Sequence, residues 1–175
     1  MKYLICSDIH GSIDSTKFLI NKFNYLKCDK IICLGDVLYH GPRNDLPPHY
    51  SPKEVIACLN PLKDKILCVK GNCEAEVDQM VLDFPILENY DTVINNISVH
   101  LEHGHHLDSY VGNAKIILYG HTHIPCCEDK NSQIYINPGS ITIPKNNSKR
   151  GYGVWEDNKI TLYTIDDEVV ASYTY

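Results

Sequence analysis

The chain has 175 residues, 43% of them hydrophobic and 22% charged, which favours one globular domain with a sizeable core over a disordered chain. Its formal net charge of -6 gives no overall basic footprint, so a nucleic acid is disfavoured as a partner. The N-terminal apolar run is too short for a signal peptide, and no run is long enough to span a membrane. We therefore expect a cytoplasmic protein.

Short apolar runs alternate with helical patterns in the first half of the chain. A helix is expected over residues 16–26, with Asp14 or Ser15 as its N-cap, and a second over residues 52–62, with Ser51 as its N-cap. Continuous apolar strands between helices are typical of a parallel sheet covered on both faces. These strands are expected at residues 3–6, 31–34 and 66–69.

The second half of the chain is richer in strands. Residues 92–95 and 97–101 flank Asn95-Asn96, which predicts a tight hairpin. Further strands are expected at residues 116–119, 133–136, 152–155 and 159–165. The sequence thus favours one α/β domain over residues 1–175, in which two sheets pack together beneath outer helices.

Eight cysteines are present, but none forms a Cys-x-x-Cys pair. A structural zinc site of that type is therefore disfavoured. Without a secretion signal, disulfides are also disfavoured. Cys6, Cys33 and Cys68 lie in apolar runs, and we expect them to be reduced core residues.

Five polar clusters follow or interrupt the expected strands. Loops at the carboxyl ends of parallel strands meet in one crevice, so side chains far apart in sequence can come together there. Each of these clusters contains a glycine, which permits tight turns and close backbone approach. The clusters are Asp8-Ile9-His10-Gly11, Gly35-Asp36, Gly71-Asn72-Cys73-Glu74, His103-Gly104-His105 and Gly120-His121-Thr122-His123.

The residue types in these clusters suit metal ions. Carboxylate and imidazole ligands match Mn, Fe, Zn or Ni better than soft copper. In Asp8-x-His10 the two side chains can point the same way, and His121-x-His123 shares that spacing. Asp36 could bridge two ions about 3.5–4 Å apart, as in two-metal phosphatases. Each cluster alone could be a helix cap or a turn, but their joint occurrence favours a dinuclear metal centre.

With these motifs the chain resembles the calcineurin-like metallophosphoesterase superfamily. The signature of that superfamily runs Asp-x-His, Gly-Asp, Gly-Asn-His-Glu/Asp, His and then Gly-His-x-His. Within it, the chain looks like the bacterial YfcE-type phosphodiesterases. The segments that carry this similarity are residues 35–44, 71–80 and Asn137-Pro138-Gly139-Ser140.

The resemblance implies a four-layer α-β-β-α sandwich and two metal sites that share Asp36. It leaves the role of His105 open. The first site would use Asp8, His10, Asp36 and His123, and the second Asp36, Asn72, His103 and His121. The ions would be two divalent transition metals, with Mn preferred over Fe, Zn or Ni.

Cys73 departs from the superfamily, most of whose members have histidine at that position, although YfcE-type proteins commonly have cysteine. We expect Cys73 to line the substrate pocket rather than to act as a ligand or nucleophile. His40 and Arg43 follow Asp36 on one loop. They are candidate substrate contacts, with Arg43 holding a phosphate oxygen. The alternative for both is a solvated loop stiffened by Pro42.

The expected activity is hydrolysis of a small phosphodiester by water activated between two metal ions, with Asn72 also in reach of substrate. One alternative is a non-catalytic scaffold such as the retromer subunit of the same superfamily. That subunit lacks part of the metal set, whereas every implied ligand position is filled here. A phosphomonoesterase or nuclease with the same centre is a further alternative. Self-association into a homo-oligomer is left open.

Overall fold

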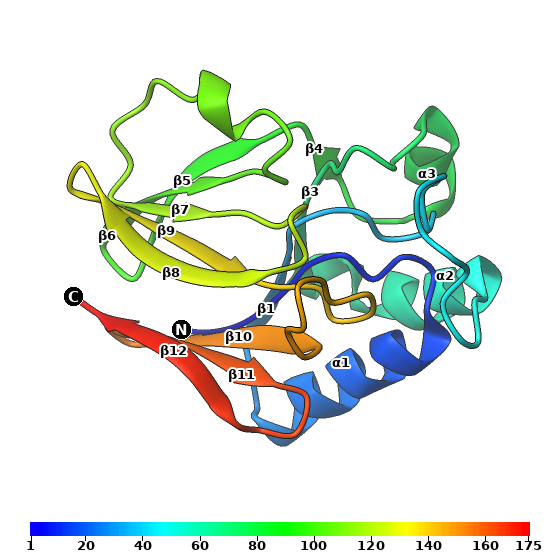
Figure 1. Ribbon diagram of the computed structural model, residues 1–175. Coiled ribbons are helices and arrows are strands. Elements are labelled where there is room, and N and C mark those ends of the chain that lie inside the picture. Colours follow the sequence, from blue (N-terminus) through cyan, green and yellow to red (C-terminus); the bar gives the residue numbers. More distant parts are fainter.

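The computed structural model describes residues 1–175 and contains two β-sheets (Figure 1). The larger sheet has the order β12-β11-β10-β1-β2-β3-β4, and the smaller sheet has the order β5-β6-β7-β9-β8. The strands of the larger sheet are β1 (Lys2–Cys6), β2 (Lys30–Cys33), β3 (Ile66–Val69), β4 (Ile86–Leu87), β10 (Gly151–Glu156), β11 (Lys159–Thr164) and β12 (Val169–Thr174). Those of the smaller sheet are β5 (Tyr90–Ile94), β6 (Ile97–Leu101), β7 (Ile116–Leu118), β8 (Pro125–Lys130) and β9 (Gln133–Pro138).

Each sheet has a parallel centre extended by antiparallel strands. In the larger sheet β1 to β4 run parallel, and β10 pairs antiparallel with β1. In the smaller sheet β6, β7 and β9 are parallel, while β5 and β8 are antiparallel neighbours. The hairpin predicted between β5 and β6 is confirmed, with Asn95 and Asn96 at φ 48° and 66°. The loops that follow β1, β2, β3, β6 and β7 carry the polar clusters.

Alternation along the strands divides the core into two layers. In β1, Leu4 packs in the cluster beneath the helices, whereas Ile5 packs in the cluster between the two sheets. The layer between the sheets also contains Trp155 from the larger sheet and Leu101 from the smaller one, both fully buried. Because every central strand is covered on both faces, these strands read as continuous apolar runs in the sequence.

Helix α1 (Ile13–Tyr25) begins earlier than the apolar pattern indicates. Its N-cap is Ser12, whose Oγ accepts a hydrogen bond from the backbone N–H of Ser15 at 3.3 Å. The expected caps Asp14 and Ser15 both lie inside the first turn, so that prediction was wrong. The cap is displaced because the first helical turn continues directly from the polar loop after β1, and Ser12 is the residue that still has extended backbone.

Helix α2 (Pro52–Leu59) is shorter than expected and continues as the 3-10 helix η1 (Asn60–Lys65). Pro61 has no backbone N–H, so it cannot extend the α-helical hydrogen-bond ladder. The proposed cap Ser51 makes no side-chain cap bond, and its hydroxyl instead donates to Glu54 at 2.9 Å. The sequence analysis missed four short or edge elements, which are α3 (Glu76–Val81), β4, β8 and β12.

The helices α1 and α2 cover the outer face of the larger sheet (Figure 1). The outer face of the smaller sheet is covered by the loop after β6, which contains the 3-10 turn η2 (Leu107–Ser109). In this loop the ring of Tyr110 stacks on His100 of β6, with ring centroids 3.8 Å apart. The predicted α/β class and two-sheet core are confirmed, and a loop rather than an α-helix forms most of the fourth layer. None of the helices has the length and apolarity that a membrane crossing requires.

Candidate functional site

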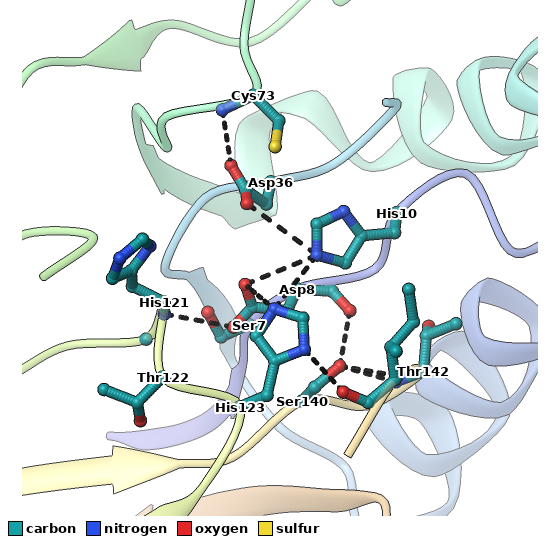
Figure 2. Close-up of polar contacts among 12 residues, drawn as sticks. Ser7, Asp8, His10, Asp36, Cys73, His121, Thr122, His123, Ser140 and Thr142 are labelled. Carbon is teal, nitrogen blue, oxygen red and sulfur yellow. Dashed lines mark hydrogen bonds and ion pairs between the residues drawn. The ribbon is translucent and has the colours of Figure 1, made fainter. Parts of the chain in front are cut away.

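Five loop residues from both sheets meet at one edge of the sandwich. Asp8 and His10 follow β1, Asp36 follows β2, His103 follows β6, and His123 lies between β7 and β8. All five side chains are buried, with residue exposures of 3% or less. Figure 2 shows Asp8, His10, Asp36 and His123 pointing toward one another. The structure therefore brings together five of the seven residues predicted as metal ligands.

Three of the histidines are fixed in the same way. The Nδ1 atom of His10 contacts the carbonyl oxygen of Tyr39 at 2.7 Å, and that of His103 contacts Leu34 at 2.6 Å. The Nδ1 atom of His123 contacts the carbonyl oxygen of Ile143 at 2.5 Å. A carbonyl oxygen only accepts, so each Nδ1 carries the proton and donates. In the neutral rings Nε2 then carries no proton and has a free lone pair. This is the tautomer that a metal ligand needs.

These Nε2 atoms converge on two carboxylate oxygens. Asp8 Oδ1 lies 3.6 Å from His10 Nε2, 3.2 Å from His123 Nε2 and 3.9 Å from His103 Nε2. Asp36 Oδ2 lies 3.3 Å from His103 Nε2 and 3.7 Å from His10 Nε2. Asp8 Oδ1 and His103 Nε2 are buried without a hydrogen-bond partner. Lone pairs that face one another in a buried site require cations or protons between them.

The titration of the cluster reflects the mutual attraction of its carboxylates and imidazoles. Burial opposes an imidazolium at His103, but the nearby carboxylates of Asp36 and Asp8 outweigh it and raise the His103 pKa to about 9. Burial likewise opposes ionisation of Asp8, but His10, His123 and His103 hold the pKa of Asp8 well below its usual range. The potential that attracts protons to these rings attracts a metal cation equally.

The backbone at the site is held in an uncommon conformation. Asp8, His10, Asp36, His121 and His123 have φ values of 58°, 49°, 56°, 66° and 60°. Such left-handed conformations cost free energy in non-glycine residues and cluster at functional sites. They recur here in residues that were singled out for their side-chain chemistry. The fold therefore holds strained loops in order to aim these side chains inward.

Gly71 allows the loop after β3 to approach Asp36. A Cβ added at Gly71 would lie 2.1 Å from Asp36 Oδ1, which no packing could accommodate. On the same loop the backbone N–H of Cys73 donates to Asp36 Oδ1 at 2.9 Å. One oxygen of Asp36 is thus fixed by the backbone, and the other is directed at the histidines.

The remaining two predicted ligands lie at the margin of this cluster. His121 is half-buried, and its ring lies 5.2 Å from that of His103, centroid to centroid. In Figure 2 it is the backbone N–H of His121, not its ring, that contacts Asp8, at 3.2 Å. Asn72 is exposed, and its Nδ2 contacts the thiol of Cys73 at 3.4 Å. Neither the ring of His121 nor the side chain of Asn72 forms a hydrogen bond to the carboxylates of Asp8 and Asp36.

A small cavity of about 30 Å³ opens directly on the cluster, between Asp36 and His123. Arg43 lines this cavity, and so does Lys145, which the sequence analysis did not single out. Lys145 stands in the loop after β9, with no motif around it, so no signal in the sequence could have identified it. Asn72, Cys73 and His121 complete the polar part of the wall.

His40 does not line this cavity. Its half-buried ring packs between Tyr39 and Tyr50, at centroid distances of 4.7 and 5.3 Å. Its Nδ1 is buried without a hydrogen-bond partner. Substrate contacts by His40 and Arg43 both stay predictions, and of the two only Arg43 lines the small cavity.

Cys73 is half-buried, and its Sγ lies within 4.8 Å of ligand atoms of His10 and Asp36. Burial, followed by the negative charge of Asp36, raises the pKa of the Cys73 thiol well above its usual range. A protonated thiol is a weak nucleophile and a weak metal ligand. Cys73 lines the small cavity, and its role as a pocket residue that is neither ligand nor nucleophile stays a prediction.

Glu74 has a structural role that the sequence analysis did not assign. Its carboxylate accepts hydrogen bonds from the backbone N–H groups of Asp36 at 2.9 Å, Val37 at 2.6 Å and Gly71 at 2.5 Å. Burial and the charge of Asp36 raise the pKa of Glu74 to about 7, although these three N–H groups oppose the shift. Glu74 thereby ties the loop after β2 to the loop after β3. Its position in the Gly-Asn-Cys-Glu cluster was the available signal.

The segment Asn137-Pro138-Gly139-Ser140 supports the site from behind. Asn137 and Ser140 are fully buried. Asn137 Nδ2 donates to the carbonyl oxygen of Gly120 at 2.7 Å, and Ser140 Oγ donates to that of Asp8 at 2.9 Å (Figure 2). Ser140 Oγ also accepts the backbone N–H of Ile143, the residue whose carbonyl fixes His123. The motif therefore positions the loops rather than meeting a ligand.

The donor set fits divalent transition-metal ions. Three groups of side chains have ligand atoms that all lie within 4.8 Å of one another. They combine carboxylate oxygens with imidazole nitrogens, which are the donors that Mn, Fe, Zn and Ni share. The groups are Asp8, His10 and His123; Asp8, Asp36 and His103; and His10, Asp36 and Cys73.

Comparison with known proteins agrees with this geometry. The family model of the calcineurin-like phosphoesterase superfamily domain matches residues 1–159. The phosphodiesterase YfcE of Escherichia coli K12 is 37% identical over 97% of this chain and 95% of its own length. The solved structure of the E. coli phosphoesterase Yfce superposes with a TM-score of 0.95 at 35% identity, covering 99% of both chains.

A more distant structure, an archaeal phosphodiesterase, shares the fold with a TM-score of 0.68 at 21% identity and covers all of both chains. The likeness to E. coli YfcE extends over nearly the whole chain rather than over isolated motifs. The chain belongs to the calcineurin-like phosphoesterase superfamily, whose members use divalent metals, and it is a hydrolase that acts on ester bonds.

Proposed function

We propose that the protein hydrolyses small phosphodiesters with the aid of two divalent transition-metal ions, Mn being the preferred metal and Fe, Zn or Ni the alternatives. The observation that carries this proposal is the convergence of three imidazole Nε2 atoms, each with Nδ1 fixed on a backbone carbonyl, on Asp8 Oδ1 and Asp36 Oδ2. The name of the E. coli relative supports the diesterase class.

The ligands are proposed as two sets that share Asp36. The first ion would be held by Asp8, His10, Asp36 and His123, and the second ion by Asp36, Asn72, His103 and His121. When bound, the two ions supply Lewis acidity toward phosphoryl oxygens and lower the pKa of a coordinated water. Asp36 suits the shared position because Cys73 N–H fixes one of its oxygens while the other faces His10 and His103.

The chain's own residues hold the phosphate in the small cavity. Arg43 and Lys145 line it and offer positive charge to nonbridging oxygens. Cys73 keeps its proton there, so it adds no negative charge against an anionic substrate. A thiol of high pKa is also a poor proton donor near neutral pH, so the leaving group departs with little help. Activated esters, such as aryl diesters, are therefore the expected best substrates.

Metal removal tests this function. The purified protein should bind about two transition-metal ions per chain, as two-metal phosphoesterases do. Chelation should abolish hydrolysis of bis(p-nitrophenyl) phosphate, and added Mn should restore it. Metal content is measured on the same samples. Full activity in a rigorously metal-free sample would exclude the proposed centre.

A further inference from the structure

A second, larger cavity adjoins the site on the side of the smaller sheet. Its volume is about 410 Å³, within the range of roughly 300–1,000 Å³ that small-molecule pockets occupy. It lies between β6 and the loop that carries η2, the light-green loop at the top of Figure 1. His103, a proposed metal ligand, and His105 form part of its wall. The cavity therefore borders the proposed metal site. It is separate from the small cavity that Arg43 and Lys145 line.

We call this second cavity the acidic cavity, because carboxylates line its floor. The floor is a buried chain of hydrogen-bonded polar groups. His100 Nδ1 contacts Asp91 Oδ1 at 2.9 Å, and His100 Nε2 contacts Glu102 Oε2 at 3.2 Å. His100 is only 3% exposed, and Tyr110 stacks on its ring. Both ring nitrogens of His100 face carboxylate oxygens, which only accept hydrogen bonds. His100 therefore donates a hydrogen bond from each nitrogen. One imidazolium and two carboxylates leave a net negative charge at the floor.

Glu102 has an unused acceptor. Its residue exposure is 7%, and its Oε1 is buried without any hydrogen-bond partner. His105 Nδ1, on the same wall, also lacks a partner. No lysine or arginine lines this cavity, and the cation that contacts Glu102, His100, lies on Oε2 and leaves Oε1 without a partner. A buried carboxylate oxygen without a donor is costly, which points to a donor brought by a ligand.

From this arrangement we propose that the acidic cavity binds one esterified alcohol of the substrate, and that this alcohol carries an ammonium or hydroxyl group which donates to Glu102. The inference rests on the proposed phosphodiesterase function and names its substrate class. A diester has two arms, and the site has a different surface for each. Cys73 lies outside the acidic cavity and lines a separate, apolar hollow of about 390 Å³ with Tyr39 and Tyr50. That hollow suits an apolar leaving group, so the acidic cavity holds the arm that stays on the phosphate.

The test compares pairs of aryl diesters that release the same leaving group. In the first pair, 2-aminoethyl p-nitrophenyl phosphate is set against ethyl p-nitrophenyl phosphate. In the second, the 4-hydroxybutyl ester is set against the butyl ester. A hydrogen bond to a charged group is worth enough to change kcat/KM about 10-fold. The Mn-loaded protein should therefore prefer the donor-bearing member by about 10-fold in the first pair, and a preference in the second pair would extend the class to polyols.

Two variants connect this preference to the cavity. Glu102→Gln should bring the ratio of kcat/KM values within the first pair close to 1. Any effect of the substitution that is common to both substrates cancels in this ratio. Glu156→Gln, an exposed carboxylate paired with Lys2 at the far end of β10, should leave the ratio unchanged. A wild-type ratio of 1 in both pairs, or an undiminished ratio in Glu102→Gln, would overturn the subsite.

A binding measurement keeps the inference separate from the proposed function. Calorimetry compares phosphoethanolamine with ethyl phosphate on the Mn-loaded wild-type protein. Tighter binding of phosphoethanolamine by about 10-fold supports the cavity even if turnover is absent, and equal binding contradicts it. Loss of turnover on every ester would instead refute the phosphodiesterase proposal. This comparison also covers the case in which Glu102→Gln does not fold.

Discussion

The inner and outer halves of the candidate site are held in place by different means. The inner set consists of Asp8, His10, Asp36, His103 and His123, whose side chains are all buried and each contact a backbone N–H or carbonyl group. The outer set consists of His121, Asn72, Arg43 and Lys145, which are half-buried or exposed. The inner set is organised by the fold before any ligand binds. The outer set has no comparable anchors, so its side chains are ordered by what they bind.

This contrast teaches which property each half controls. A fixed set of donors loses little conformational entropy when an ion binds, so it determines metal affinity. The exposed cations of the outer set, Arg43 and Lys145, act mainly on substrate binding. Substitutions in the inner half should therefore change metal content and turnover together, and those of Arg43 and Lys145 should change KM with the metal retained.

The largest effect is expected for Asp36→Asn. Loss of this charge removes the shared ligand, so activity should fall by more than about 100-fold, beyond the usual cost of losing a supporting partner. At least one metal equivalent should be lost from a folded protein. Elemental analysis and kcat/KM are measured together. Asp8→Asn serves as a comparison and should affect the second ion, that of Asp36, Asn72, His103 and His121, less. If Asp36→Asn kept two ions and normal turnover, Asp36 would not be the ligand that the two ions share.

The second prediction compares two histidines on one loop. His123→Ala removes a ligand whose Nδ1 is anchored on Ile143, and metal affinity should fall by about 100-fold. His121→Ala removes a half-buried ring that the protein does not hold on the carboxylates, and the fall should be nearer about 10-fold. Titration of Mn into the metal-free proteins gives both values. Equal losses would mean that the two halves are equally organised.

The third prediction concerns the cations of the outer set. Arg43→Ala and Lys145→Ala should each raise KM by about 3- to 10-fold, because an exposed charge gives a screened contact to phosphate. Metal content should stay unchanged. Lys149→Ala is the matched control, since this lysine stands on the same loop but is paired with Glu168. A loss of bound metal in either test variant would move that residue into the inner half.

The smallest effect is expected for Cys73→Ser. This variant should keep both metals and much of the activity on aryl esters, because the thiol is protonated and serves neither as ligand nor as nucleophile. Cys73→His should improve hydrolysis of poorly activated esters relative to aryl esters, since histidine titrates near neutral pH. Rates on both substrate types and metal content are compared. Loss of metal in a folded Cys73→Ser variant would give the thiol a primary role.

The central strands were predictable because each lies in a continuous apolar run. The edge elements β4, β8 and β12 were missed for the opposite reason. β8 and β12 carry few buried side chains, and β4 has only two residues, so a periodic pattern is weak or absent. The cysteines illustrate a confirmed expectation. Cys6, Cys33 and Cys68 are free and buried on three neighbouring parallel strands, where they act as small core residues.

The sequence by itself determined the residue types of the site, because its carboxylates, imidazoles and glycines stand in short motifs that follow the strands. It also determined the family, since these motifs occur in one order along the chain. Only the tertiary structure decided which side chains are fixed and which are free. The carbonyl groups that orient His10, His103 and His123 belong to residues 20 to 69 positions away. Lys145 and the acidic cavity beneath Tyr110 likewise depend on packing between distant segments, which no local pattern records.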